Sequence, residues 1–216
     1  MNNTVYLCDC MDYMKGLPDN AFDLAIVDPP YGIGYEDGGQ YYNGIIGKEW
    51  DSLVPDIKYF SEICRVSNNQ IIWGGNYFGL PATRCVIAWT KTVELQNRTF
   101  SEWEMAWTSF QSPARWVNMK PFQRNGSRIH PTQKPSELYK WILKNYAKPG
   151  QTIFDSHVGS GSIRIACHDM GYDFTGCELD PDYHVAQEDR FNTHKAQGQL
   201  FDPVELTKNE YVQVAL

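Results

Sequence analysis

Short apolar runs alternate with stretches of helical spacing along most of this chain. Apolar runs bounded by Asp, Asn, Gly or Pro predict strands at residues 5–8, 22–27, 70–73, 85–89, 102–108, 152–155 and 174–178. Apolar positions three and four residues apart predict helices at 11–17, 55–66, 136–146, 162–170 and 181–195. Because strands alternate with helices, we expect an α/β fold with a mostly parallel sheet covered on both faces.

The chain is predicted to form a single domain over residues 1–197. A length of 216 residues is enough for one sizeable α/β core and marginal for two. A loop rich in Gly, Tyr and Asp follows the second strand over residues 31–48, and its composition predicts mobility. Residues 198–216 are expected to form a peripheral tail.

Composition narrows the class of protein. With 42% hydrophobic and 21% charged residues, the chain is typical of a globular protein, and no apolar run approaches the roughly 20 residues that span a bilayer. Residues 1–4 lack the features of a secretory signal. The six Cys have no paired spacing typical of zinc sites, so we expect reduced thiols, no metal and a cytoplasmic protein.

The net charge of −7 argues against a nucleic-acid partner until its distribution is considered. No acidic residue lies between Glu104 and Glu137, whereas that segment contains Arg115, Lys120, Arg124, Arg128 and Lys134. Aromatic residues at 107, 110, 116 and 122 are interleaved with these cations, as in surfaces that contact phosphates and bases. A solvated loop with incidental charge is the alternative interpretation.

A glycine-rich turn follows the predicted strand 152–155 and precedes a predicted helix. Gly159 and Gly161 would let a ligand approach the backbone closely, next to the free N–H groups of the helix. Glu178 lies seventeen residues beyond Gly161, at the end of the next predicted strand, where a carboxylate can accept both ribose hydroxyls of an adenosine. This order favours an adenosyl or nucleotide site, although such glycines also serve close helix–strand packing.

The tetrapeptide Asp28-Pro29-Pro30-Tyr31 directly follows the predicted buried strand 22–27. It is therefore expected at the carboxyl edge of the sheet, where such folds bind ligands. The prolines stiffen the turn and leave carbonyl acceptors beside the Asp28 carboxylate. Two acceptors that converge on an –NH₂ group suit an exocyclic amine, with Tyr31 available to stack on the base. A rigid loop with a solvent-facing Asp is the alternative.

These motifs, in this order, resemble the β-class amino-methyltransferases of DNA, which carry [DNS]-P-P-[YFW] as catalytic motif and FxGxG as cofactor motif. The resemblance covers residues 4–193. It implies a Rossmann-like, circularly permuted fold with a seven-stranded sheet, S-adenosylmethionine as cofactor and double-stranded DNA as partner. Leu7-Cys8-Asp9-Cys10 resembles the element near the cofactor adenine, Trp89-Thr90-Lys91 the W-x-K strand end of the target pocket, and His130-Pro131-Thr132-Gln133-Lys134-Pro135 the element that contacts the methionine portion.

The resemblance also implies the following residue roles. The catalytic residues are Asp28, Pro29, Pro30 and Tyr31. The cofactor-binding residues are Asp9, Cys10, Asp28, His130, Thr132, Lys134, Asp155, His157, Gly159, Gly161, Ser162, Glu178 and Leu179. The nucleic-acid-binding residues are Tyr31, Trp89, Lys91, Arg115, Lys120, Arg124 and Arg128, with a small target-recognition insertion at about 108–129.

Two positions depart from the family pattern. The family commonly has D-P-F before the glycines, whereas this chain has Asp155-Ser156-His157, so His157 replaces an aromatic that flanks the cofactor. The element at Leu7 also lacks the usual Gly. Neither change removes a group that the reaction requires.

The sequence therefore predicts transfer of a methyl group to N6 of adenine in DNA, on a nucleotide swung out of the duplex. Asp28 favours adenine because the motif of the N4-cytosine enzymes more often begins with Ser. Methylation of cytosine N4 is thus the first alternative, and methylation of RNA or of a protein amide is the second. The third alternative is a non-catalytic adenosyl- or nucleic-acid-binding module. We expect a bacterial protein, or a phage protein in the host cytoplasm, that acts without a fused nuclease. The oligomeric state is left open, with a homodimer as one arrangement.

Overall fold

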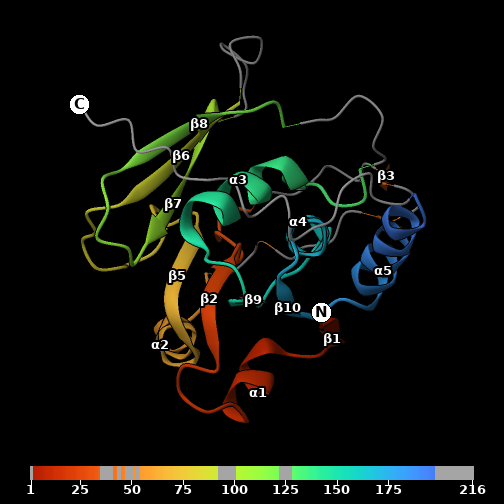
Figure 1. Ribbon diagram of the computed structural model, residues 1–216, viewed down its shortest axis with the longest axis horizontal. Coiled ribbons are helices and arrows are strands. Elements are labelled where there is room, and N and C mark those ends of the chain that lie inside the picture. Colours follow the sequence, from red (N-terminus) through yellow and green to blue (C-terminus); the bar gives the residue numbers. More distant parts are fainter. Residues whose placement is uncertain are drawn as a thin grey trace.

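The computed structural model of the chain describes residues 2–34, 51, 54–91, 101–121 and 128–197, together with the backbone of residues 41–42 and 45–46. The central feature is an eight-stranded sheet in the order β1-β10-β9-β2-β5-β7-β6-β8 (Figure 1). Its strands are β1 (Asn3–Leu7), β2 (Phe22–Val27), β5 (Ser67–Trp73), β6 (Val86–Thr90), β7 (Trp103–Thr108), β8 (Arg115–Asn118), β9 (Thr152–Asp155) and β10 (Asp173–Glu178). A separate antiparallel pair consists of β3 (Tyr41–Tyr42) and β4 (Ile45–Ile46).

Most neighbouring strands of this sheet are parallel, as predicted. Only β7 runs against its neighbours β5 and β6, while β8 returns to the direction of β6. The strands β1, β10, β9, β2 and β5 therefore end at one edge of the sheet. That edge is where open α/β sheets bind ligands.

Two strands differ from the sequence-based expectation. The sheet has eight strands and not seven, because β8 forms within the segment 108–129; it is short, and only Val117 of its four residues is buried, so it carries little apolar pattern. Strand β5 begins at Ser67, three residues earlier than predicted. Ser67 and Gln70 are buried polar residues that bond each other and the preceding helix, and such residues hide a strand from a search for apolar runs.

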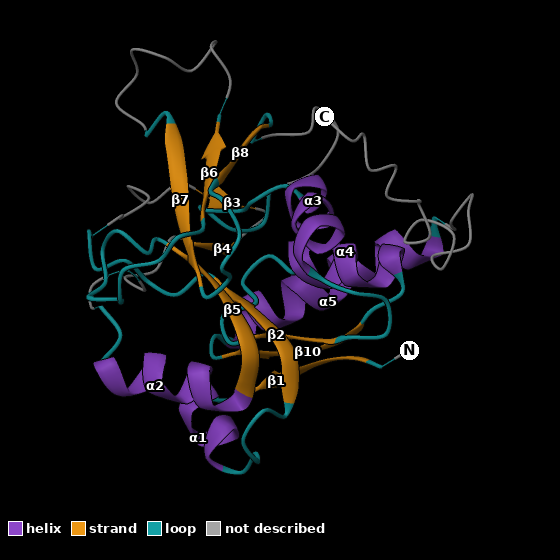
Figure 2. Cartoon of the chain, turned by 60° about the vertical axis from the view of Figure 1, so that its left-hand side comes forward, coloured by secondary structure: helices purple, strands orange, loops and turns teal. Residues whose placement is uncertain are grey.

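In the described part of the chain, helices cover both faces of the sheet (Figure 2). They are α1 (Cys10–Lys15), α2 (Ile57–Val66), α3 (Ser136–Tyr146), α4 (Ser162–Met170) and α5 (Pro181–Ala196). On one face, Met14 of α1 and Ile63 of α2 pack with buried residues of β2 and β5. On the other face, Leu138 of α3 and Ile163 of α4 pack with Trp73 of β5 and other strand residues. Full burial of each such side chain contributes about 1.5–3 kcal/mol, so the three layers stabilise one another.

The turns that follow the parallel strands begin helices. Asp9 follows β1 and caps α1 by accepting the N–H of Met11 at 2.7 Å. Asp180 follows β10 and caps α5, which has Pro181 in its first turn. Gly161 precedes α4 with a φ of 70°, in the left-handed region that favours glycine. These strand–helix turns gather polar groups at one edge of the sheet.

No helix in the described part of the chain is long and apolar enough to cross a bilayer. The rest of the predicted mobile loop 31–48, beyond Tyr31–Gly34 and the backbone of β3 and β4, lies outside the described residues. The predicted tail 198–216 lies outside them as well.

Candidate active site

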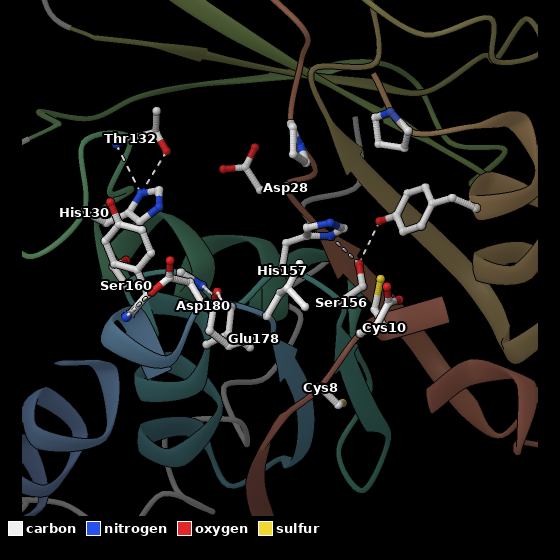
Figure 3. A pocket seen from close by; sticks show the side chains of 18 of the residues that line it. Cys8, Cys10, Asp28, His130, Thr132, Ser156, His157, Ser160, Glu178 and Asp180 are labelled. Atoms are coloured by element: carbon white, nitrogen blue, oxygen red, sulfur yellow. Dashed lines mark hydrogen bonds between the residues drawn. The ribbon is translucent and has the colours of Figure 1, made fainter. Parts of the chain in front are cut away.

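A cavity of about 870 Å³ lies at the carboxyl ends of β1, β2, β9 and β10 (Figure 3). This volume is within the range of about 300–1,000 Å³ found for small-molecule and cofactor sites. The cavity is lined by most of the residues that the sequence predicted for the cofactor: Asp9, Cys10, Asp28, His130, Thr132, Lys134, His157, Gly159, Ser162, Glu178 and Leu179. Residues from both ends of the chain thus meet around one space.

Two residues predicted for the cofactor do not line this cavity. Asp155 is 2% exposed, and its Oδ1 accepts the backbone N–H of His157 at 3.0 Å, so it shapes the turn from beneath. Burial raises the pKa of Asp155 to about 8. A Cβ on Gly161 would lie 3.2 Å from Cβ of Gln187, so this glycine permits close packing of the turn against α5. Both residues support the shape of the turn in this structure, and their contacts with a cofactor stay predictions.

Glu178 is held in a fixed position at the end of β10. Its Oε2 accepts the N–H of Gly159 at 2.8 Å, and its Oε1 accepts the N–H of Asp180 at 2.9 Å. Burial raises the pKa of this carboxyl above its ordinary value. Each carboxylate oxygen has further lone pairs, so the pair can still accept hydrogen bonds from a ligand in the cavity.

His157 lies in the cavity wall beside Ser156 (Figure 3), and it also contacts Tyr59. Its Nδ1 lies 2.9 Å from Oγ of Ser156, which lies 2.7 Å from the Tyr59 hydroxyl. The Tyr59 ring also contacts the imidazole edge-on, with centroids 5.4 Å apart. Burial lowers the pKa of His157 to about 4, so the imidazole is neutral near pH 7. At this position the chain has a neutral ring that is fixed by hydrogen bonds.

His130 and Thr132 form the wall opposite His157 in Figure 3. Nδ1 of His130 lies 3.1 Å from Oγ1 of Thr132, and its ring packs on Tyr183 with centroids 4.4 Å apart. Burial, together with the charges of Lys134 and Arg128, lowers the pKa of His130 to about 3. This turn therefore offers neutral polar groups to the cavity.

Asp28 extends from the end of β2 into the same cavity. Its Oδ1 accepts the hydroxyl of Tyr31 at 2.6 Å, and its Oδ2 accepts the ammonium of Lys134 at 2.5 Å. Pro30 also lines the cavity, whereas Pro29 is buried. The carboxylate is therefore oriented by a phenol and a cation before any substrate arrives.

Tyr31 is predicted to stack on a base, and in this structure its ring already has neighbours. It stacks on Tyr77 with centroids 5.0 Å apart and an interplanar angle of 18°. A Cβ on Gly74 would lie 2.2 Å from Cε1 of Tyr31, so the ring occupies the space that only glycine leaves open. The N–H groups of Tyr31 and Gly32 both donate to Oδ1 of Asp51, which fixes the turn.

Lys134 is buried beside Asp28, with 3% of its side chain exposed. Its Nζ also lies 3.2 Å from Oε2 of Glu104, and Oε1 of Glu104 lies 2.5 Å from Nζ of Lys91. Burial alone would lower the pKa of Lys134, but the carboxylates of Asp28 and Glu104 outweigh it and raise that pKa. Lys134 lines the cavity, and its charged group is directed to the carboxylate of Asp28.

The residues predicted to bind nucleic acid are more dispersed. Trp89 is 2% exposed and donates its Nε1–H to the carbonyl of Met119, so it is corrected from a target-pocket contact to a core residue. Arg115 and Lys120 are exposed near β8, and Arg128 is half-buried with its Nε donating to the carbonyl of His130. Lys91 is bound to Glu104, and Arg124 lies outside the described residues.

Several lining residues carried no signal that could be recognised in the sequence. Tyr59 and Asp56 come from the start of α2, and Tyr183 from the first turn of α5. In the sequence, the spacing of these helices predicts only packing.

Glu104 does not line the cavity, but it contacts Lys134, and the sequence contains one sign of this role. It is the one acidic residue at 103–107, in a predicted strand that is otherwise aromatic and apolar there. A buried acid of this kind needs a cation nearby.

Within the described residues, no group of three or more His, Cys, Asp or Glu side chains is arranged to hold a metal ion.

A family model and a relative in sequence are both described as methylases. The sequence profile of the N6_N4_Mtase family, described as DNA methylase, matches residues 68–188. The methylase YubD of Escherichia coli (strain K12) is 27% identical over 203 residues, which covers 84% of this chain and 87% of YubD.

Two solved structures have a similar fold. The PvuII DNA methyltransferase, named as cytosine-N4-specific, has a TM-score of 0.63 at 14% identity, with 96% of this chain and 90% of that chain covered. The M1.HpyAVI–SAM complex has a TM-score of 0.57 at 20% identity, with 87% and 98% covered.

Proposed function

This chain belongs to the N6/N4 DNA methylase family, and we propose that it transfers the methyl group of S-adenosylmethionine to N6 of adenine in DNA. One observation carries the proposal. Asp28 of the amine-binding tetrapeptide and Glu178, the ribose-type carboxylate, line the same cavity although they lie 150 residues apart in sequence. A site for an adenosyl group and an acceptor for an amine are therefore next to each other.

The residues of the cavity fit the proposed cofactor. Glu178 has two fixed carboxylate oxygens for ribose hydroxyls, and Gly159 brings the backbone close without a side chain. Asp9, His157 and Leu179 supply polar and apolar groups for the adenine portion, and His130 and Thr132 supply neutral polar groups for the methionine portion. When bound, the cofactor supplies an electrophilic methyl group on a sulfonium.

Asp28 is assigned to the amine. The lone pair of an adenine amino group is delocalised into the ring, so the nitrogen is a weak nucleophile until it becomes tetrahedral. Acceptance of its N–H bonds by Asp28 and by the Pro29 carbonyl favours that geometry and stabilises the positive charge that develops on nitrogen. The proton released after transfer goes to Asp28 or to solvent. The chain's contribution is therefore positioning and electrostatics.

DNA is the proposed substrate because the chain's family is that of the DNA methylases. The amine is hidden within a duplex, so the nucleotide must swing out at a cost of a few kcal/mol. Tyr31 is the proposed stacking partner, and about 1–3 kcal/mol per base is typical of such contacts. Since Tyr31 now stacks on Tyr77, the incoming base either displaces Tyr77 or uses another part of the ring. Arg115, Lys120, Arg124 and Arg128 are the proposed phosphate and recognition contacts.

Cytosine N4 is the second candidate for the modified amine. A cytosine-N4-specific enzyme has a similar fold, so the fold by itself does not separate the two bases. Asp28, where the cytosine enzymes more often have Ser, favours adenine. RNA adenine is the third candidate, and it shares the same amine chemistry.

The test compares the wild type with Asp28→Asn, using labelled S-adenosylmethionine with unmethylated DNA and with RNA. Nucleoside mass spectrometry is expected to find N6-methyladenine in DNA with the wild type, and at least a hundredfold less with the variant. Cofactor binding by calorimetry is expected to persist in Asp28→Asn. Detection of N4-methylcytosine, or of label in RNA alone, would replace the assigned substrate, and a wild type that binds the cofactor without transfer would contradict the enzymatic role.

A further inference from the structure

Four charged side chains alternate in sign between the surface and the catalytic turn. In order they are Lys91, Glu104, Lys134 and Asp28, and their three contacts measure 2.5, 3.2 and 2.5 Å. Lys91 directly follows β6, Glu104 is on β7, Lys134 is in the turn before α3 and Asp28 directly follows β2. With both lysines protonated, two positive and two negative charges balance one another.

We propose that Glu104 is a positioning residue for methyl transfer, because it shares the ammonium of Lys134 and so leaves Asp28 with negative charge for the substrate amine. The inference rests on the proposed function and extends it to a residue outside the cavity lining. Glu104 touches neither substrate nor cofactor in this assignment. It acts through Lys134.

The surroundings of Lys134 make the sharing possible. Its Nζ lies within 3.4 Å of three acceptors, namely Asp28 Oδ2, Glu104 Oε2 and the Tyr31 hydroxyl, and an ammonium has three N–H donors. The Trp73 ring lies 5.1 Å from the same nitrogen. The cation is therefore fixed between two carboxylates and an aromatic ring, and only 3% of its side chain is exposed.

The position of the Lys134 ammonium between Asp28 and Glu104 affects the charge around the reacting amine. During transfer, positive charge moves onto the amine nitrogen beside Asp28. Without the charge of Glu104, two ammonium groups would face one carboxylate, and the surroundings of that nitrogen would carry an extra positive charge. Lys134 would also pair with Asp28 alone and would compete with the amine for its oxygens. Both effects raise the barrier for transfer in a site with little solvent screening.

The strand geometry explains how Glu104 reaches this position. Glu104 of β7 is the register partner of Trp89 of β6, so the two side chains project to the same face of the sheet. The N–H of Lys91 bonds the carbonyl of Glu102 at 2.9 Å, which aligns the ends of the two strands. The antiparallel run of β7 thus delivers an acidic residue to the same edge as the carboxyl ends of the parallel strands.

The test measures kcat and KM for Glu104→Gln, Lys91→Met and the double variant, at saturating DNA and cofactor. We expect kcat of Glu104→Gln to fall at least tenfold, while KM for S-adenosylmethionine stays within about threefold. Lys91→Met removes a positive charge and serves as the reference for the double variant. The double variant restores the balance and is expected to be at least threefold faster than Glu104→Gln. Glu188→Gln is the matched control. It removes the carboxylate of α5 that pairs with the buried Arg164 of α4, and it is expected to keep wild-type kcat.

A readout without turnover accompanies the kinetics. Lysine-labelled protein followed by NMR is expected to show a lower pKa for Lys134 in Glu104→Gln, because one of its two carboxylates is gone. If Glu104→Gln does not fold, the charge-preserving Glu104→Asp decides the matter, with kcat expected within about fivefold of the wild type. A Glu104→Gln fall of less than tenfold, a double variant no faster than it, or a Glu104→Asp more than fivefold slower than the wild type would overturn the inference. A wild type without transferase activity would instead contradict the proposed function.

Discussion

The ammonium of Lys134 lies 2.5 Å from Oδ2 of Asp28, although 106 residues separate the two in sequence. Removing the cation would leave the largely buried Asp28 carboxylate without a cation, and Glu104 would keep only Lys91. We therefore expect Lys134→Met to lower the free energy of unfolding by about 3–5 kcal/mol at pH 7. Since the carboxylates raise the pKa of Lys134, this contribution is complete below the unfolded value of about 10.4 and is lost as pH rises through the folded value.

Urea denaturation across pH 6–11 measures that effect. Lys15→Met is the control, because Lys15 makes an exposed ion pair with Asp12 that contributes about 1 kcal/mol at most. Equal stability of Lys134→Met and the wild type at pH 7 would show that the pair does not stabilise the fold.

Gly74 controls the position of the Tyr31 ring. Its φ of 70° is strained for other residues, and a Cβ there would overlap the ring. Gly74→Ala is expected to cost about 1–3 kcal/mol of stability and to reduce kcat, because Tyr31 must leave its place beside Asp28. Gly79→Ala is the control, since a Cβ at Gly79 would meet nothing within 4 Å. Thermal melting and methyl transfer by both variants test this, and equal behaviour of the two would contradict it.

Glu178 is expected to determine cofactor affinity. Glu178→Gln replaces one acceptor oxygen by a donor group and removes the charge. A hydrogen bond to a charged group contributes about 1.5–3 kcal/mol, so the Kd for S-adenosylmethionine should rise about ten- to a hundredfold. Titration calorimetry measures it, with Glu137→Gln on the outside of α3 as control. An unchanged Kd would remove Glu178 from the proposed ligand contacts.

His157 should make the fold sensitive to acid. The unfolded chain binds a proton on this histidine near pH 6.5, whereas burial lowers the pKa in the folded state to about 4. Stability from this group is complete above pH 6.5 and is lost as pH falls toward 4. Relative to the wild type, His157→Phe should therefore gain about 1–2 kcal/mol between pH 7 and pH 5. Chemical denaturation at the two pH values checks this, and a constant difference would contradict it.

Lys120 is expected to contribute to DNA affinity without base selectivity. It is exposed just after β8, in the basic segment that the sequence singled out. Loss of one phosphate contact reduces the slope of log K against log salt by about 0.9. Lys120→Ala should therefore show a shallower salt dependence, whereas Lys15→Ala at the end of α1 should not. Binding titrations at several salt concentrations measure both slopes.

The local apolar pattern of the sequence predicts the parallel strands of the sheet, but it misses the edge strand β8. The parallel strands 22–27, 152–155 and 174–178 are apolar runs bounded by turn residues, and the structure has strands there. The strand at Arg115–Asn118 was not predicted, because one buried residue in four leaves no period to detect. Edge strands owe their existence to a neighbour's hydrogen bonds, which a linear pattern does not contain.

In the candidate site, too, the sequence motifs predict some of the residues and miss the contacts between others. Motif order indicated that Asp28 and Glu178 belong to one site, and both line the cavity. Contacts between charges distant in sequence were not predicted, such as Glu104 with Lys134. The sequence predicts Trp89 in the target pocket, but its burial depends on its contacts with Trp73 of β5 and with the carbonyl of Met119, which its own residue type does not reveal.

The pairing of β1 with β10 has a consequence for synthesis of the protein. Asn3 lies opposite Phe174 and Leu7 opposite Glu178, so β1 gains its neighbour in the sheet only after β10 has been synthesised. Contacts of such sequence separation form slowly, because a long chain must first be closed. A chain that stops before β10 lacks one wall of the cavity, so the cavity can form only after β10 has left the ribosome.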